Sequence, residues 1–140
     1  MTKQLTDSRD TPTEPSDRSA TTGADSIIAS LEAATVKHVF GVQGGAIMPV
    51  YDALYSSDIQ HITMAHEQGA SHAADAYGIV AGVPGVCFAT SGPGATNLIT
   101  GLADADMDSD PVLALTGQVP KEFLGRDAFQ ETDTIGVTLL

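Results

Sequence analysis

Short apolar runs alternate with segments of helical periodicity along most of the chain, and this alternation limits the possible folds more than any other feature. The runs with strand character lie at 38–42, 61–65, 85–89 and 111–116. Each ends in glycine or polar residues, and the first three are followed by apolar residues at helical spacing. Strands that alternate with helices favour a parallel sheet, because the helices supply right-handed crossovers. We therefore predict an α/β fold, a parallel sheet flanked by helices on both faces.

The helical segments can be placed approximately. The first is predicted from a cap at Asp25 or Ser26, the second from the apolar residues of 47–54, the third over 66–81 and the fourth over 95–107. The third helix carries small residues on one predicted face, which indicates close packing. That face comprises Ala70, Ala73, Ala74, Tyr77 and Val80.

Composition bounds the domain organisation and the partners. Residues 1–22 are rich in Thr, Ser, Asp and Pro and predict a disordered tail, which leaves 23–140 as the domain. A formal net charge of −12 argues against nucleic-acid binding. It fits either an ordinary acidic surface or, as we favour, adaptation to high salt. No apolar run of membrane-spanning length and no secretion signal occur, so we expect a cytoplasmic protein with no membrane contact.

Glycine and polar residues follow each predicted strand, at Gly44–Gly45, His66–Gln68, Thr90–Gly94 and Gly117–Gln118. Because the carboxyl ends of parallel strands share one edge of a sheet, all four segments should line that edge, where ligands bind in such folds.

The individual motifs are ambiguous when taken alone. Residues 92–97 suit either a phosphate-binding loop or a plain strand-to-helix turn, and Asn97 stands where a dinucleotide motif would have its third glycine. His66 and His72 lack the spacing of zinc ligands, so no metal site is predicted. Glu67 could simply complement a helix dipole, although its small apolar neighbours suit a carboxyl that exchanges protons.

Several motifs in register resemble one enzyme family. They include FGVQGGAIMPVYDAL at 40–54, HEQGA at 66–70, ATSGPGATNL at 89–98, TGQVP at 116–120 and DAFQETD at 127–133. Together they closely resemble the large subunit of acetolactate (acetohydroxyacid) synthases, which depend on thiamine diphosphate. The resemblance runs from about Gly23 to Thr138 and implies the N-terminal, pyrimidine-binding domain of that family.

The resemblance implies roles for particular residues. Glu67 would hydrogen-bond N1′ of the aminopyrimidine and promote its imino tautomer. The activated cofactor would then attack pyruvate, release CO2 and add the remaining fragment to a second 2-oxo acid. This reaction belongs to branched-chain amino acid biosynthesis. Gly44, Gly45 and Ala46 would lie beside the thiazolium, and Pro93, Gly94 and Asn97 against the pyrimidine. Gln130 would reach toward the reacting centre. The phosphate interpretation of residues 92–97 is then dropped, since another domain holds the diphosphate.

The same resemblance sets limits. The family's Mg2+ and FAD domains have no counterpart here, so we expect a C-terminally incomplete domain that is inactive alone. We expect it to pair with the diphosphate-binding domain of a synthase subunit or to form a homo-oligomer. The alternatives are a non-catalytic remnant or a subunit-interaction module, and more distantly a dehydrogenase-like nucleotide-binding domain. Gln43 replaces the family's usual proline, which predicts a less rigid loop with room for an extra side-chain contact. Ile79 stands where the family has arginine, and Asp110 where it has an apolar residue.

Overall fold

The computed structural model describes residues 21–139, so residues 1–20 of the expected tail lie outside the described residues. The first helix begins earlier than the predicted caps. Thr22 is its N-cap: the Thr22 hydroxyl accepts a hydrogen bond from the Asp25 N–H at 3.1 Å, and the Asp25 carboxylate accepts from the Thr22 N–H at 2.8 Å. This reciprocal capping box explains why Asp25 lies in the first turn and not at the cap.

Four parallel strands form one sheet in the order β2-β1-β3-β4, which confirms the predicted fold class. The strands are β1 (His38–Gly41), β2 (Gln60–Thr63), β3 (Gly85–Ala89) and β4 (Val112–Thr116). Every residue of β3 is buried, as expected for a central strand covered on both faces.

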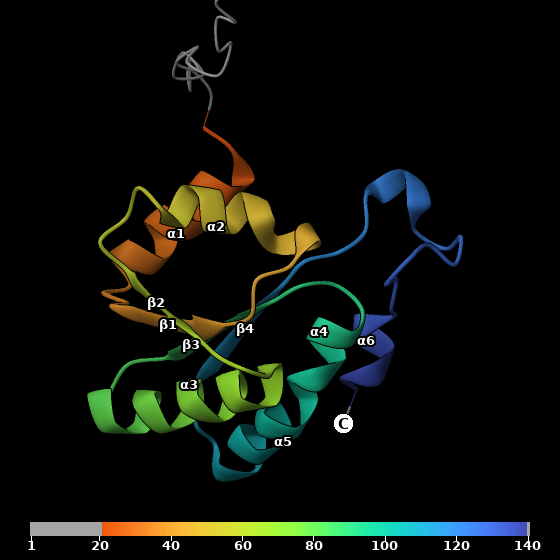
Figure 1. The fold of residues 1–140 in the computed structure, drawn as a ribbon. Coiled ribbons are helices and arrows are strands. Elements are labelled where there is room, and N and C mark those ends of the chain that lie inside the picture. The colour runs from red at the N-terminus through yellow and green to blue at the C-terminus, as the bar shows by residue number, and fades with distance from the viewer. Residues whose placement is uncertain (1–20, 140) are drawn as a thin grey trace, which may run out of the picture.

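Helices cover both faces of the sheet (Figure 1). On one face lie α1 (Gly23–Ala33) and α2 (Met48–Leu54), and on the other lie α3 (Glu67–Ala81) and α5 (Ile99–Asp108). The shorter helices are η1 (Gly45–Ile47), α4 (Pro93–Asn97), η2 (Lys121–Phe123) and α6 (Thr134–Val137). None of the helices described over residues 21–139 combines the length and apolar character that a bilayer span requires.

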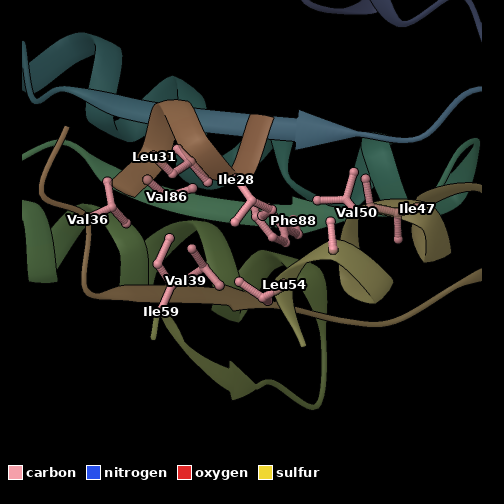
Figure 2. Close-up of a cluster of buried hydrophobic side chains, with 11 residues drawn as sticks. Ile28, Leu31, Val36, Val39, Ile47, Val50, Leu54, Ile59, Val86 and Phe88 are labelled. Carbon is pink, nitrogen blue, oxygen red and sulfur yellow. The ribbon is translucent and has the colours of Figure 1, made fainter. Parts of the chain in front are cut away.

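An aliphatic cluster fills the space between the sheet and helices α1 and α2. Figure 2 shows side chains from α1, α2 and the sheet converging there, with Phe88 of β3 at its centre. Ile28 and Leu31 reach it from α1, and Val50 and Leu54 from α2. The periodicity that predicted these two helices thus reflects burial of one face of each.

The opposite face packs more closely, because small residues allow the backbones to approach. A Cβ on Gly85 of β3 would lie 1.9 Å from the Ala74 carbonyl oxygen of α3. Ala70 and Ala74 are fully buried as predicted, but Val80 is 88% exposed. That part of the prediction was wrong, because at about 100° per residue Val80 lies roughly 120° from the line of Ala74.

The predicted helix over 95–107 is in fact two helices. They separate at Leu98, whose N–H donates to the carbonyl of Ala95 three residues back. This tighter turn drives the Leu98 side chain into the core, where it is fully buried. The first of the two begins at Pro93, a residue suited to the first helical position.

Candidate functional site

The candidate site lies where the strand order changes direction. From β1 the chain crosses by α2 to β2 on one side, and then by α3 to β3 on the other side of β1. In open parallel sheets this arrangement leaves a crevice beyond the carboxyl ends of the two strands that diverge. Here those ends are followed by Gly44 and Thr90, so the structure brings two of the predicted segments to one place.

Glu67 and Asn97 meet at this crevice. Glu67 is the first residue of α3, and Asn97 is the last residue of α4. The Asn97 side-chain amide donates to Oε2 of Glu67 at 3.0 Å. Both residues are half-buried. The carboxylate is therefore held in one orientation by a neutral donor, and its surroundings are not the wholly apolar ones expected from its sequence neighbours.

Gly94 lies against the other oxygen of the same carboxylate. A Cβ on Gly94 would be 3.5 Å from Oε1 of Glu67 and 2.8 Å from the methyl carbon of Thr90. Gly94 is buried, whereas its neighbour Pro93 is exposed. Three of the predicted site residues, Glu67, Gly94 and Asn97, thus form one contiguous group. Pro93 begins α4 next to Gly94.

The predicted glycine loop approaches this group from β1. A Cβ on Gly44 would lie 2.5 Å from the Cβ of Thr90, so a side chain is excluded at that position. The N–H of Ala46 donates to the Thr90 hydroxyl oxygen at 3.2 Å. Gly117, which follows β4, packs closely on the backbone of Ala46. Gly45 is exposed, and a Cβ there would meet nothing within 4 Å.

Gln130 reaches the crevice by its backbone. Gly92 has a φ of 60°, and a Cβ there would lie 2.6 Å from the Gln130 carbonyl oxygen. The loop that carries Gln130 is closed by Glu131, whose carboxylate accepts from the N–H groups of Gly125 and Ala128. These bonds, with that to Gly125 the largest influence, lower the pKa of Glu131.

A polar cluster lies beside the glycine loop. The Gln43 amide nitrogen is 3.4 Å from the Thr63 hydroxyl and 3.5 Å from Nδ1 of His61, so the extra side-chain contact predicted for this residue is present. Nε2 of His61 is 3.0 Å from the hydroxyl of Tyr51, and the two rings meet edge to face. Burial raises the pKa of Tyr51 to about 12 and lowers the pKa of His61.

Other titratable side chains lie outside this group. His66 is the N-cap of α3, because its Nδ1 accepts from the N–H of Gln68 at 3.1 Å. Cys87 is fully buried in β3, and burial raises its pKa to about 12. His72 lies 3.5 Å from a carboxylate oxygen of Asp104, a pair on the exposed side of α3 and α5. No group of three or more potential ligands in the described part of the chain is arranged to hold a metal ion.

Sequence reasoning missed the central position of Thr90. It was noted only as one letter of a motif, whereas its side chain contacts Gly44, Gly94 and Ala46 together. The available signal was its place directly after the most apolar strand, between two glycine-containing segments. The role of Glu131 in closing the loop of Gln130 was likewise missed.

Comparisons with known proteins found a matching family and similar sequences. Residues 21–137 match the family described as thiamine pyrophosphate enzyme, N-terminal TPP binding domain. The chain is 59% identical over 115 residues to the probable acetolactate synthase large subunit of Methanocaldococcus jannaschii, and 59% identical over 117 residues to the acetolactate synthase isozyme 2 large subunit of Escherichia coli. These alignments cover 82% and 84% of this chain but only 20% and 21% of the relatives. The chain thus spans about a fifth of the length of the curated relatives it matches.

Proposed function

The chain belongs to the family of N-terminal TPP binding domains of thiamine pyrophosphate enzymes, and from this premise we propose that it binds the aminopyrimidine of thiamine diphosphate as the N-terminal segment of an acetolactate synthase large subunit. The observation that carries the proposal is the group formed by Glu67, Asn97 and Gly94 at the switch-point crevice. Its members come from two segments that are far apart in sequence.

The residues present fit a flat, nitrogen-containing ring. Gly94 offers no side chain beside Oε1 of Glu67, so a planar group can approach that oxygen. Asn97 occupies Oε2, and within residues 21–139 no donor contacts Oε1. An aminopyrimidine presents a ring nitrogen and an exocyclic amine, which can bond a carboxyl oxygen and the backbone groups of the surrounding turns.

The chemistry divides between cofactor and protein. When bound, thiamine diphosphate supplies the carbanion equivalent needed to decarboxylate a 2-oxo acid. Glu67 holds or transfers one proton at Oε1, the oxygen that Asn97 leaves accessible. Asn97 keeps the carboxyl group of Glu67 from rotating. Gly44 and Gly94 leave the ring position free of side chains. Gln130 would close the crevice from the side of Gly92.

The wider assignment follows from the relatives' names. We propose pyruvate and a second 2-oxo acid as substrates, with the diphosphate, its Mg2+ and any FAD held by parts outside this chain. In that arrangement this domain supplies the proton partner, and it pairs with the diphosphate-binding domain of a synthase subunit. The isolated chain is then inactive.

A chimera tests the proposal. Residues 21–137 would replace the matching segment of the Escherichia coli isozyme 2 large subunit, and acetolactate formation from pyruvate would be measured with thiamine diphosphate, Mg2+ and FAD. We expect activity in the chimera and a loss of about 100-fold or more in its Glu67→Gln form. Glu32→Gln, on the exposed side of α1, is the matched control and should keep activity. A folded chimera whose Glu67→Gln form is fully active would refute the proposal.

One observation favours a second candidate, a non-catalytic subunit-interaction module. Several large apolar side chains after β4 are exposed, including Phe129 at 87%, Ile135 at 76% and Leu139 at 77%. Such residues are typical of a surface that another chain covers. Co-elution with a full-length synthase subunit on size exclusion, combined with an inactive chimera, would favour this alternative. Measurable NAD binding would instead favour a dehydrogenase-like domain.

A further inference from the structure

We propose that Thr90 is a positioning residue, whose hydroxyl and methyl groups fix the Gly44–Ala46 loop against Gly94 and so set the width of the crevice in front of Glu67. This inference rests on the proposed function, because it concerns the place where the aminopyrimidine would bind. Thr90 is not among the site residues predicted from the sequence.

The threonine side chain joins the two walls by different chemical groups. Its hydroxyl oxygen accepts from the N–H of Ala46 at 3.2 Å, which holds the loop after β1. Its methyl carbon would be 2.8 Å from a Cβ on Gly94 and 2.8 Å from a Cβ on Gly44, so it occupies the space that both glycines leave. A polar contact and an apolar contact thus converge on one residue.

Thr90 is anchored by the sheet, and the loop that it contacts ends at Ile47, which is buried in the cluster between the sheet and helices α1 and α2. Thr90 directly follows β3, which is fully buried and paired with β1 and β4. In the loop, Gly45 has nothing near the position of a Cβ. Ala46 is held from the other side by Gly117, whose Cβ would lie 2.6 Å from the Ala46 carbonyl carbon. Before Ile47, the loop therefore lies between Thr90 on one side and Gly117 on the other.

Few residue types can make both contacts. Threonine is β-branched, so its χ1 rotamer is restricted. The same rotamer therefore fixes the positions of both its methyl group and its hydroxyl group. Valine would keep a branched apolar side chain but remove the acceptor for the Ala46 N–H. Serine would keep the acceptor but remove the methyl group that fills the space beside Gly44 and Gly94. The two substitutions separate the polar contact from the packing contact.

The experiment uses the full 140-residue chain and its Thr90→Val, Thr90→Ser and Thr116→Val forms. Thr116 ends β4, the neighbouring strand, and serves as the matched control. Hydrogen exchange of the Ala46 amide is followed by NMR without ligand, and thiamine diphosphate is then titrated into the same samples. The amide reports the loop directly, and the titration reports the crevice.

We expect Thr90→Val to speed exchange of the Ala46 amide by about tenfold and to weaken thiamine diphosphate binding by a similar factor, since one hydrogen bond is lost. Thr90→Ser should restore slow exchange at Ala46 and recover part of the affinity, while Thr116→Val should change neither. Unchanged Ala46 exchange in Thr90→Val would overturn the inference, and so would unchanged affinity in that variant.

The failure of the proposed function gives a different pattern. If the unsubstituted chain does not bind thiamine diphosphate while Ala46 exchange responds to Thr90→Val, the result counts against the proposed function and supports the link between Thr90 and the loop. Glu67→Gln separates the two further, because it should weaken binding while leaving Ala46 exchange unchanged.

Discussion

A nearly isosteric substitution can turn the attractive contact between Asn97 and Glu67 into a repulsive one. In Asn97→Asp the donor nitrogen, 3.0 Å from Oε2 of Glu67, is replaced by a carboxylate oxygen. A charge-assisted hydrogen bond is lost and two like charges face each other, while the shape of the side chain is kept. The substitution therefore tests the electrostatics of the site with little change in packing.

The expected magnitude follows from the distance. Loss of a hydrogen bond to a charged group costs about 1.5–3 kcal/mol. Two unit charges about 3 Å apart repel by about 1.4 kcal/mol in water and by about 5.5 kcal/mol at an effective dielectric constant of 20. Because both residues are half-exposed, the repulsion should lie near the lower value. We therefore expect Asn97→Asp to lower the free energy of unfolding by about 3 kcal/mol at neutral pH.

Urea denaturation at about pH 7 measures this loss. Thr100→Asp, which adds the same charge at an exposed position in α5, is the control and should change stability by less than about 1 kcal/mol. Equal stability of the two variants at neutral pH would refute the reasoning.

Three further predictions concern the core and its titrating groups. Gly85→Ala should destabilise the chain by about 3 kcal/mol or more in urea denaturation, because its Cβ would meet the Ala74 backbone carbonyl, which cannot move without shifting α3. Burial lowers the pKa of His61, so the neutral ring is favoured in the folded state and stability should fall as the pH drops below about 6.5. His61→Gln should flatten that dependence of the unfolding free energy on pH. Cys87, whose pKa burial raises to about 12, should react with a thiol reagent only after denaturant is added; rapid reaction of the native chain would contradict its placement.

The sequence was sufficient to predict the fold class and the edge of the sheet at which the site lies. Both follow from local patterns: apolar runs with glycine after them predict strands and turns, and parallel strands bring their carboxyl ends together. The predicted strand 85–89 matches β3 throughout. A short, continuous apolar run with glycine turns at its ends is typical of a buried parallel strand. Periodicity was less reliable for α3, where Val80 fell outside the buried face.

Contacts between distant segments could not be predicted from such patterns. The pairing of Asn97 with Glu67 joins residues 30 positions apart, and it depends on the break at Leu98 that ends α4 beside α3. The approach of Gln130 to Gly92 depends on a loop that Glu131 closes through backbone hydrogen bonds. The break at Leu98 depends on burial of one side chain, and the loop closure depends on the carboxylate of Glu131. Neither feature gives a periodic pattern in the sequence.

The position of Asn97 shows how one such contact changes the chemistry that a motif can support. A dinucleotide-binding turn has a glycine at this position, which serves close packing of helix on strand. Asparagine instead places its amide on Glu67, and α4 is only 5 residues long. The crevice therefore presents an oriented carboxyl group. That difference favours a ligand that exchanges a proton at a ring nitrogen over one that is held by its phosphates.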